Sequence, residues 1–183
     1  MWKFDSIVCI NLYERNDRME ECLKVFEKLK IPGIKRFHRH VDGKRGCHES
    51  HLSVIKEAYD EGCRNVLIFE DDIMPSPEYS EKYIIEAGKF VNNNKNWDIF
   101  YLGHQPNVFF SESTVVENNI MKCFSTLTHA YVLSRKFMKK IMNRIYDGTA
   151  IDKIYLKMKI LMRYIQCNFI KTNRLHRYEG FVI

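Results

Sequence analysis

Hydrophobic residues occur in this chain in two alternating patterns. Continuous runs, of which Ile7-Val8-Cys9-Ile10 is the first, are typical of strands buried on both faces. Between the runs, hydrophobic residues recur every three or four positions, as at Met19, Cys22 and Phe26, which is typical of amphipathic helices. The runs predict strands at residues 4–11, 34–41, 65–69, 97–102, 130–133 and 165–170. The periodic segments predict a first helix that starts after an N-cap at Asn16 or Asp17 and stops at Pro32-Gly33, and further helices at 47–59, 78–91, 135–146 and 151–164.

This alternation of strands and helices predicts an α/β fold, with a central sheet that carries helices on its faces. The segment 104–124 has no clear periodicity, and we expect loops and a short strand there. In sheets of this kind, ligands bind outside the carboxyl ends of the strands. Polar clusters at 11–18, 42–46 and 70–72 each follow a predicted strand, so a binding site is expected at that edge.

The composition is that of a folded globular domain. The chain has 183 residues, of which 45% are hydrophobic and 28% charged, and this excludes a disordered or collagen-like chain. No apolar run approaches the roughly 18 residues of a membrane helix, and Asp5 interrupts the region where a signal peptide would be apolar. We therefore expect a cytoplasmic chain without a targeting or membrane segment of its own. The six cysteines include no CxxC pair and are expected to be reduced thiols.

The net charge narrows the range of partners only slightly. The chain carries 29 Lys and Arg against 23 Asp and Glu, a net charge of +6, which suits a nucleic acid, a membrane surface or a phosphate-bearing small molecule. In the basic segment 153–177, aromatic residues such as Tyr155 and Tyr164 alternate with Lys and Arg, a pattern also found in nucleic-acid binders. A solvated basic helix explains the same residues, so no nucleic-acid partner is expected. Peripheral association with a membrane stays open.

Three consecutive acids, Glu70-Asp71-Asp72, follow the clearest buried strand of the chain. Grouped carboxylates at the end of a buried strand are costly unless something neutralises them. Carboxylate oxygens suit Mg²⁺ or Mn²⁺, which typically bind substrate phosphates as well. The alternative is a solvated acidic turn that caps the following helix.

Two arginines, Arg15 and Arg18, lie at the start of the first predicted helix. A cation at a helix N-terminus opposes the helix dipole, so a phosphate or carboxylate partner would explain this placement. Ion pairs with Glu14 or Glu21 explain it equally well.

The segment Gly46-Cys47-His48-Glu49-Ser50-His51 is expected to open the second helix, where free backbone N–H groups can face an anion. Four histidines between positions 38 and 51, together with Cys47, also suggest zinc, but their spacing matches no structural zinc pattern. A capping or core role for His51 is the simpler interpretation.

Two residues near the carboxyl terminus are weaker candidates. Asp152 opens the basic helix, where an acid is favourable by itself, but a carboxylate could also serve as a general base for an acceptor hydroxyl. His176 is a lone histidine, which is more often structural than a ligand.

Taken together, the motifs resemble those of glycosyltransferase family 25, which contains bacterial lipooligosaccharide galactosyltransferases and the collagen galactosyltransferases of animals. Singly each motif is weak, but six occur in the order found in that family. They are Ile7 to Leu12 with Arg15 and Asp17-Arg18; Val41-Asp42-Gly43 with Gly46-Cys47 and Ser50-His51; Leu67 to Ile73; Trp97 to Gly103; His129 to Ser134; and Ile151-Asp152.

The resemblance implies a GT-A-type, Rossmann-like nucleotide-sugar fold with a mixed central sheet. It implies one domain over 1–183, with a nucleotide-sugar half at about 1–103 and an acceptor half at about 104–183. It also implies transfer of galactose or glucose from a UDP-sugar, with inversion and with Mn²⁺ or Mg²⁺, to a glycan, glycolipid or protein hydroxyl. The alternative is a catalytically silent nucleotide-sugar-binding module of the same fold.

The resemblance also suggests roles for individual residues. Asp72, Glu70 and His176 would bind the metal, and Asp152 would be the catalytic base. The donor-binding residues would be Asn11, Leu12, Arg15, Arg18, Asp42, Gly43, Ser50, His51 and Asp71.

Overall fold

A computed structural model describes residues 4–39, 43–75, 80–103, 114–117, 120–122, 129–146, 165–167 and 181–182. The helices are α1 (Asn16–Lys28), α2 (Gly43–Asp60), α3 (Glu81–Asn93) and α4 (Arg135–Tyr146). The strands are β1 (Ser6–Leu12), β2 (Lys35–Arg39), β3 (Asn65–Glu70), β4 (Ile73–Met74), β5 (Ile99–Gly103), β6 (Thr114–Glu117), β7 (Ile120–Lys122), β8 (Ala130–Ser134), β9 (Ile165–Cys167) and β10 (Phe181–Val182).

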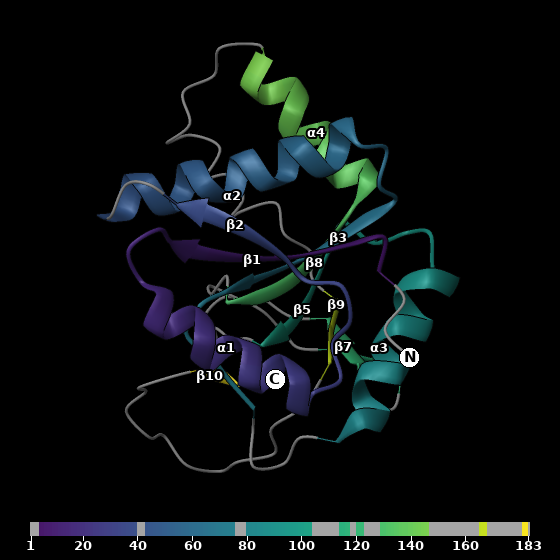
Figure 1. The fold of residues 1–183 in the computed structure, drawn as a ribbon. Coiled ribbons are helices and arrows are strands. Elements are labelled where there is room, and N and C mark those ends of the chain that lie inside the picture. The colour runs from purple at the N-terminus through teal and green to yellow at the C-terminus, as the bar shows by residue number, and fades with distance from the viewer. Residues whose placement is uncertain are drawn as a thin grey trace.

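The strands form a mixed central sheet in the order β2-β1-β3-β8-β5-β9-β7-β6, and β4 pairs separately with β10. Strands β2, β1 and β3 are parallel, whereas β8 runs antiparallel to both β3 and β5. Because β8 lies between β3 and β5, the sheet joins segments that are distant in the sequence. Figure 1 shows α2 and α4 on one side of this sheet and α1 and α3 on the other.

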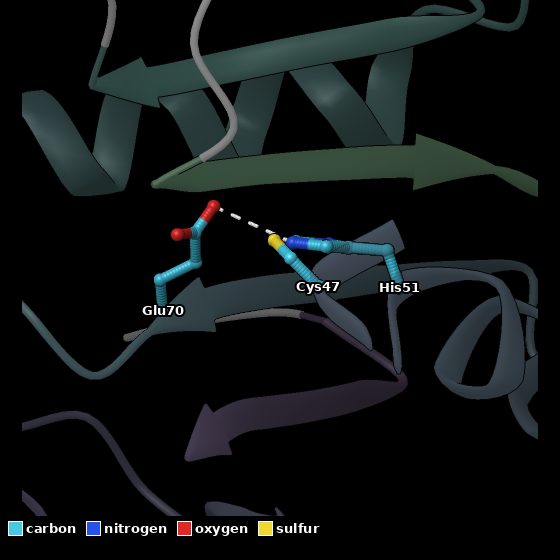
Figure 2. Close-up of side chains that lie close together, drawn as sticks. All are labelled: Cys47, His51 and Glu70. Carbon is cyan, nitrogen blue, oxygen red and sulfur yellow. Dashed lines mark ion pairs between the residues drawn. The ribbon is translucent and has the colours of Figure 1, made fainter. Parts of the chain in front are cut away.

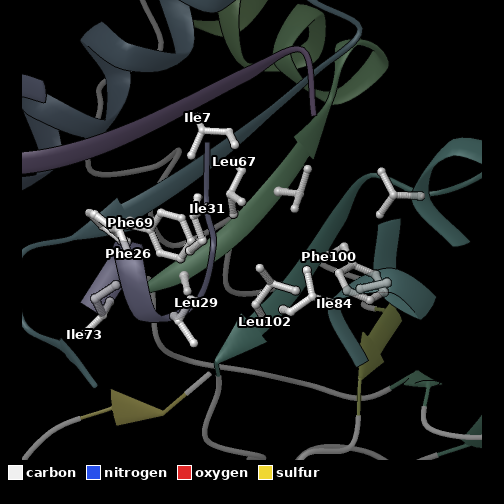
Figure 3. Packing of buried hydrophobic residues seen from close by; sticks show 14 of the residues in the cluster. Ile7, Phe26, Leu29, Ile31, Leu67, Phe69, Ile73, Ile84, Phe100 and Leu102 are labelled. Atoms are coloured by element: carbon white, nitrogen blue, oxygen red, sulfur yellow. The ribbon is translucent and has the colours of Figure 1, made fainter. Parts of the chain in front are cut away.

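Each side of the sheet has its own hydrophobic core. On one side, every second residue of β1, β3 and β5, such as Ile7, Phe69 and Phe100, packs against the apolar stripes of α1 and α3 (Figure 3). On the other side, Val8 and Ile68 belong to the core formed with α2 and α4. The continuous apolar runs are therefore strands buried on both faces, as expected. The expected α/β class, mixed sheet and covering of both faces are confirmed.

Each of the six predicted strands overlaps a strand of the structure, and α4 has the predicted bounds. Two short strands, β4 and β10, were not predicted, because a pair of residues carries no periodicity. The segment 104–124 contains the antiparallel pair β6 and β7 rather than one short strand. The helix predicted at 151–164 lies outside the described residues.

Three helix boundaries differ from the prediction. Helix α2 begins at Gly43 instead of residue 47, because its first turn holds Lys, Arg and Gly and so has no apolar stripe. Helix α3 begins only at Glu81, since Ser80 has an extended backbone. Helix α1 ends before Pro32-Gly33: Lys30 adopts a left-handed conformation (φ 52°), and its N–H donates to the Glu27 carbonyl at 3.0 Å.

The connections of the first strands diverge at one place in the sheet. Strand β1 leads through α1 to β2 on one side, whereas β3 leads through β4 and α3 to β5 on the other. The carboxyl ends of the adjacent strands β1 and β3 therefore form a topological switch point, where α/β sheets typically bind ligands. Because β8 is antiparallel, its amino end lies at the same edge of the sheet.

Candidate active site

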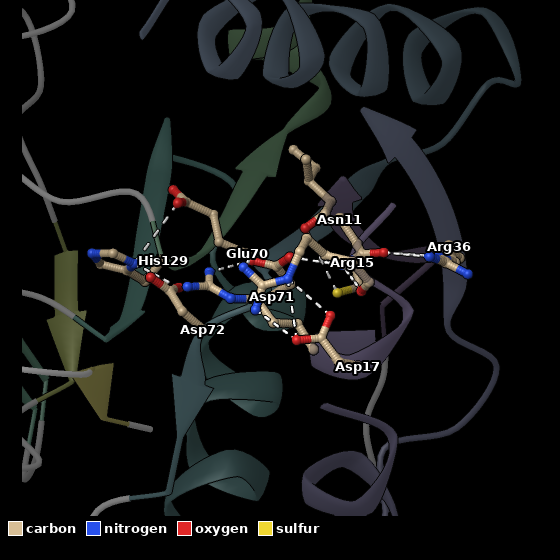
Figure 4. Close-up of polar contacts among 11 residues, drawn as sticks. Asn11, Arg15, Asp17, Arg36, Glu70, Asp71, Asp72 and His129 are labelled. Atoms are coloured by element: carbon tan, nitrogen blue, oxygen red, sulfur yellow. Dashed lines mark hydrogen bonds and ion pairs between the residues drawn. The ribbon is translucent and has the colours of Figure 1, made fainter. Parts of the chain in front are cut away.

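Polar side chains from three adjacent strands meet at this edge (Figure 4). Strand β1 contributes Asn11, β3 ends at Glu70, and Asp71 and Asp72 follow in a turn. Residue His129 immediately precedes β8, and its carbonyl accepts a hydrogen bond from the Glu70 N–H at 3.0 Å. This backbone contact places the histidine beside the acidic motif.

Glu70, Asp72 and His129 form the first of two potential metal-binding clusters among the described residues. His129 Nδ1 lies 3.2 Å from Asp72 Oδ1 and 3.8 Å from Glu70 Oε2. Burial by itself lowers the pKa of His129, but the hydrogen bond to Asp72 and the charges of both acids raise it above its ordinary value. Two carboxylates and an imidazole at this spacing can coordinate a divalent cation such as Mn²⁺.

Asp71 turns away from the other two acids. It accepts a hydrogen bond from Asn11 Nδ2 at 2.7 Å and pairs with Arg18 Nη1 at 3.3 Å. Its side chain therefore faces β1 and α1, whereas the side chains of Glu70 and Asp72 face His129. The contact between Asn11 and Asp71 bridges the carboxyl ends of β1 and β3 at the switch point.

The Asn11 amide also organises the first strand-to-helix turn. Its Nδ2 donates to the Arg15 carbonyl at 3.0 Å, and its Oδ1 accepts from Arg36 Nε at 3.0 Å. Arg36 also donates to Asn16 Oδ1 at 2.9 Å. Sequence reasoning missed Arg36, because the strand register that brings β2 alongside β1 is not visible in the local pattern.

The two arginines of this turn have different surroundings. Arg15 makes a bidentate contact with Asp17, with Nε 2.8 Å from Oδ1 and Nη2 2.6 Å from Oδ2, on the exposed surface. Arg18 instead faces Asp71. Both arginines thus have carboxylate partners, as one of the two alternatives had it, rather than the ion pairs with Glu14 or Glu21. Leu12, also predicted near the donor, is the last residue of β1.

The second potential metal-binding cluster consists of Cys47, His51 and Glu70 (Figure 2). His51 is only 8% exposed, and its Nδ1 lies 2.7 Å from the Tyr131 hydroxyl. Its Nε2 is 3.4 Å from Glu70 Oε1 but has no hydrogen-bond partner with suitable geometry. Burial alone lowers the pKa of His51, whereas Cys47 and Glu70 raise it to about 9. Burial raises the pKa of Tyr131 well above its usual range, so its hydroxyl stays protonated.

The expectation that Gly46 opens the second helix is wrong. Only the first four N–H groups of a helix lack an intrahelical acceptor, and α2 begins at Gly43. The N–H groups from Cys47 onward therefore lie inside the helix and do not face an anion. Ser50 likewise donates within the helix, to the Gly46 carbonyl at 2.6 Å.

Three of the predicted site residues, Asp42, Asp152 and His176, lie outside the described residues. His129, a member of one cluster, and Tyr131, which contacts His51 of the other, were given no role from the sequence. Only the antiparallel pairing of β8 with β3 brings them to these positions. Within the part of the chain that the structure describes, no helix is long and apolar enough to cross a membrane.

Curated relatives resemble the chain over about three quarters of its length. Procollagen galactosyltransferase 1-A of Xenopus laevis is 25% identical over 172 residues, which cover 76% of this chain and 28% of that protein. A protein of Bos taurus described as a probable inactive glycosyltransferase 25 family member 3 is 26% identical over 173 residues, covering 76% of this chain and 29% of that protein. The chain therefore spans little more than a quarter of the length of these relatives.

Among solved structures, the fold resembles that of a protein described as mannose-1-phosphate geranyltransferase from Thermus thermophilus. The TM-score is 0.51 at 11% sequence identity, and the match covers 89% of this chain and 73% of that one. The likeness supports the expected GT-A-type fold.

The profile of glycosyltransferase family 25 (LPS biosynthesis protein) matches residues 33–155, which include the acidic motif, β8 and Asp152. The chain therefore belongs to glycosyltransferase family 25.

Proposed function

We propose that the chain transfers a hexose, galactose or glucose, from a UDP-sugar to a hydroxyl group with inversion of configuration. The acceptor would be a glycan, a lipid-linked glycan or a protein. The observation that carries this proposal is the cluster of Glu70, Asp72 and His129 at the switch point between β1 and β3. Family membership supports the reaction class, since the relatives above include a galactosyltransferase.

The residues of this cluster fit Mn²⁺ or Mg²⁺, because both ions prefer carboxylate oxygens and accept imidazole. Glu70 and Asp72 would hold the ion, with His129 as the imidazole ligand among the described residues. His176, proposed from the sequence, would be a further ligand. Bound there, the ion would neutralise the charge that develops on the UDP leaving group.

The nucleotide would lie over the carboxyl ends of β1 and β3. Arg18 is partly exposed beside Asp71 and could reach a phosphate, while the Asn11 amide holds the turn in place. Further contacts with the donor would come from Leu12, Arg15, Asp42, Gly43, Ser50 and His51. The half at 1–103 would bind the donor and the half at 104–183 the acceptor.

Transfer needs a base on the acceptor side. Asp152 would take the proton of the acceptor hydroxyl as that oxygen attacks the anomeric carbon and the bond to UDP breaks. An Asp152→Asn variant should retain donor binding and lose transfer, measured as release of UDP in the presence of acceptor. Full activity in this variant would exclude Asp152 as the base.

The first test is calorimetric titration with a panel of UDP-sugars, in Mn²⁺ and then in EDTA. Asp72→Ala should weaken the Mn²⁺-dependent binding by at least about 100-fold, because even a residue that only hydrogen-bonds a metal ligand typically contributes about 10–100-fold in metal affinity. Asp60→Ala removes an exposed acid at the end of α2 and serves as the matched control. Binding that is equal in EDTA, or unchanged by Asp72→Ala, would contradict the proposed metal site.

The second candidate function is a silent nucleotide-sugar-binding module. It is favoured by the similarity to a relative described as probably inactive. The module would be supported over the enzyme by metal-dependent donor binding without release of UDP. This must hold both with water alone and with every acceptor in a panel of glycans and hydroxylysine peptides.

A further inference from the structure

We propose that Cys47, His51 and Glu70 form a second metal site, selective for Zn²⁺ and distinct from the cluster assigned to Mn²⁺. The site goes beyond the proposed function: it assigns His51 to a metal rather than to the sugar donor, and it shares Glu70 with the Mn²⁺ cluster through a different oxygen.

The three ligands come from two elements that hold them rigidly. Cys47 and His51 are four residues apart on α2 and so lie on one face of that helix, and Glu70 ends β3, opposite that face. One potential ligand atom from each residue lies within 4.8 Å of the others. Figure 2 shows the Cys47 sulfur and the His51 ring together, facing the Glu70 carboxylate.

The orientation of His51 is the independent observation that points to a ligand. Its Nε2 is buried without a hydrogen-bond partner and faces Glu70 Oε1 at 3.4 Å. Its Nδ1 contacts the Tyr131 hydroxyl at 2.7 Å. With Nδ1–H donating to that hydroxyl oxygen, a metal ion that displaces the proton from Nε2 would bind the Nε2 lone pair. Metal-binding histidines typically have this outer-shell partner on the other ring nitrogen.

The donor set explains the choice of metal. Zn²⁺ accepts thiolate, imidazole and carboxylate ligands, and open zinc sites have three protein ligands with the fourth position left for water. The cluster of Glu70, Asp72 and His129 has no sulfur and suits a harder ion. Glu70 contributes to both clusters through different oxygens, with Oε1 toward His51 and Oε2 toward His129. Loss of Asp72 should therefore leave the zinc site intact.

The test uses the full, reduced chain with Co²⁺ as a spectroscopic probe and Zn²⁺ titrated against a chromophoric chelator. We expect a sulfur-to-cobalt charge-transfer band that one equivalent of Zn²⁺ removes. Cys47→Ser should abolish the band and weaken Zn²⁺ binding by at least about 100-fold, more than an outer-shell change would. Because Cys47 is only partly buried, this variant should fold, which circular dichroism checks.

Two further variants test whether the band comes from these three ligands. Cys63→Ser changes another partly buried cysteine, beyond the end of α2, and should leave the band and the affinity unchanged. Asp72→Ala should retain the cobalt band while losing Mn²⁺-dependent donor binding, so the zinc site and the proposed function can fail independently. Absence of the band in the unmodified chain, or its persistence in Cys47→Ser, would overturn the proposal. Either result would leave His51 as an imidazolium paired with Glu70.

Discussion

The two ends of strand β3 differ in how well their polar groups are satisfied. At the amino end, Asn65 Oδ1 accepts from the Asp5 N–H at 3.0 Å, and the Asp5 carboxylate accepts from the Arg64 backbone and guanidinium at 2.7–2.9 Å. Nearby, Arg135 Nη1 donates to the Tyr59 and Cys63 carbonyls at 3.0 and 3.1 Å, where α2 ends. These contacts neutralise charge and close helix ends, so they stabilise the fold.

At the carboxyl end, three acids follow one another and a buried imidazole nitrogen has no hydrogen-bond partner. Grouped like charges and unsatisfied buried polar groups reduce stability, and they persist where function requires them. We therefore expect the amino end of β3 to serve stability and the carboxyl end to serve the proposed ligand binding. Variants at the two ends should separate these properties.

The largest effect is expected for Glu70→Gln, since both metal clusters include this residue. The change keeps the side-chain shape and removes the negative charge, so metal-dependent binding of UDP-sugar should weaken by at least about 100-fold. The melting temperature without metal should change little, because relief of the repulsion from the two neighbouring acids offsets the loss of the ion pairs with His51 and His129. Calorimetry and thermal unfolding measure the two properties. If stability falls more than donor binding does, the carboxyl end is structural and the two ends do not differ in role.

A smaller effect, on stability alone, is expected for Arg135→Ala. The guanidinium lies over the Tyr59 ring at 4.5 Å in addition to capping α2. Loss of two charge-assisted hydrogen bonds should lower the free energy of unfolding by about 2 kcal/mol, which corresponds to about 4–8 °C in a chain of this size. Arg135→Lys is the matched control. Its free energy of unfolding should lie between those of the unmodified chain and Arg135→Ala, because an ammonium lacks the planar fork of a guanidinium. Weakened donor binding in a folded Arg135→Ala protein would contradict the separation of the two ends.

The smallest effect concerns Asp5, whose pKa is held below its usual value chiefly by hydrogen bonds from Arg64. A lowered folded-state pKa contributes stability above the ordinary pKa of about 4 that is lost as pH falls through the folded value. Asp5→Asn should therefore lower the melting temperature by only about 2 °C at pH 7, and the difference should shrink as the pH falls below about 4 and Asp5 becomes protonated in the folded state. A difference that does not change with pH would mean that the charge of Asp5 is irrelevant.

Much of the fold could be predicted from the sequence. The apolar runs identified β1 and β3 because a strand covered by helices on both faces has few polar positions. The bounds of α4 followed from its strong amphipathic pattern. Pairing partners and strand direction were not predictable, since an antiparallel β8 between β3 and β5 leaves no mark on its local composition.

The candidate site, like the fold, could be predicted from the sequence only in part. The acids Glu70 to Asp72 and the edge of the sheet on which they lie could be predicted from the local pattern, because charge directly after a buried strand is visible there. The positions of His129 beside Asp72 and of Tyr131 beside His51 depend on the folded chain, since these contacts join residues 57 and 80 positions apart. The tertiary structure also decided that Asp71 turns to Asn11 and Arg18. These choices depend on strand order and direction, which arise from the burial of the whole sheet rather than from any short segment.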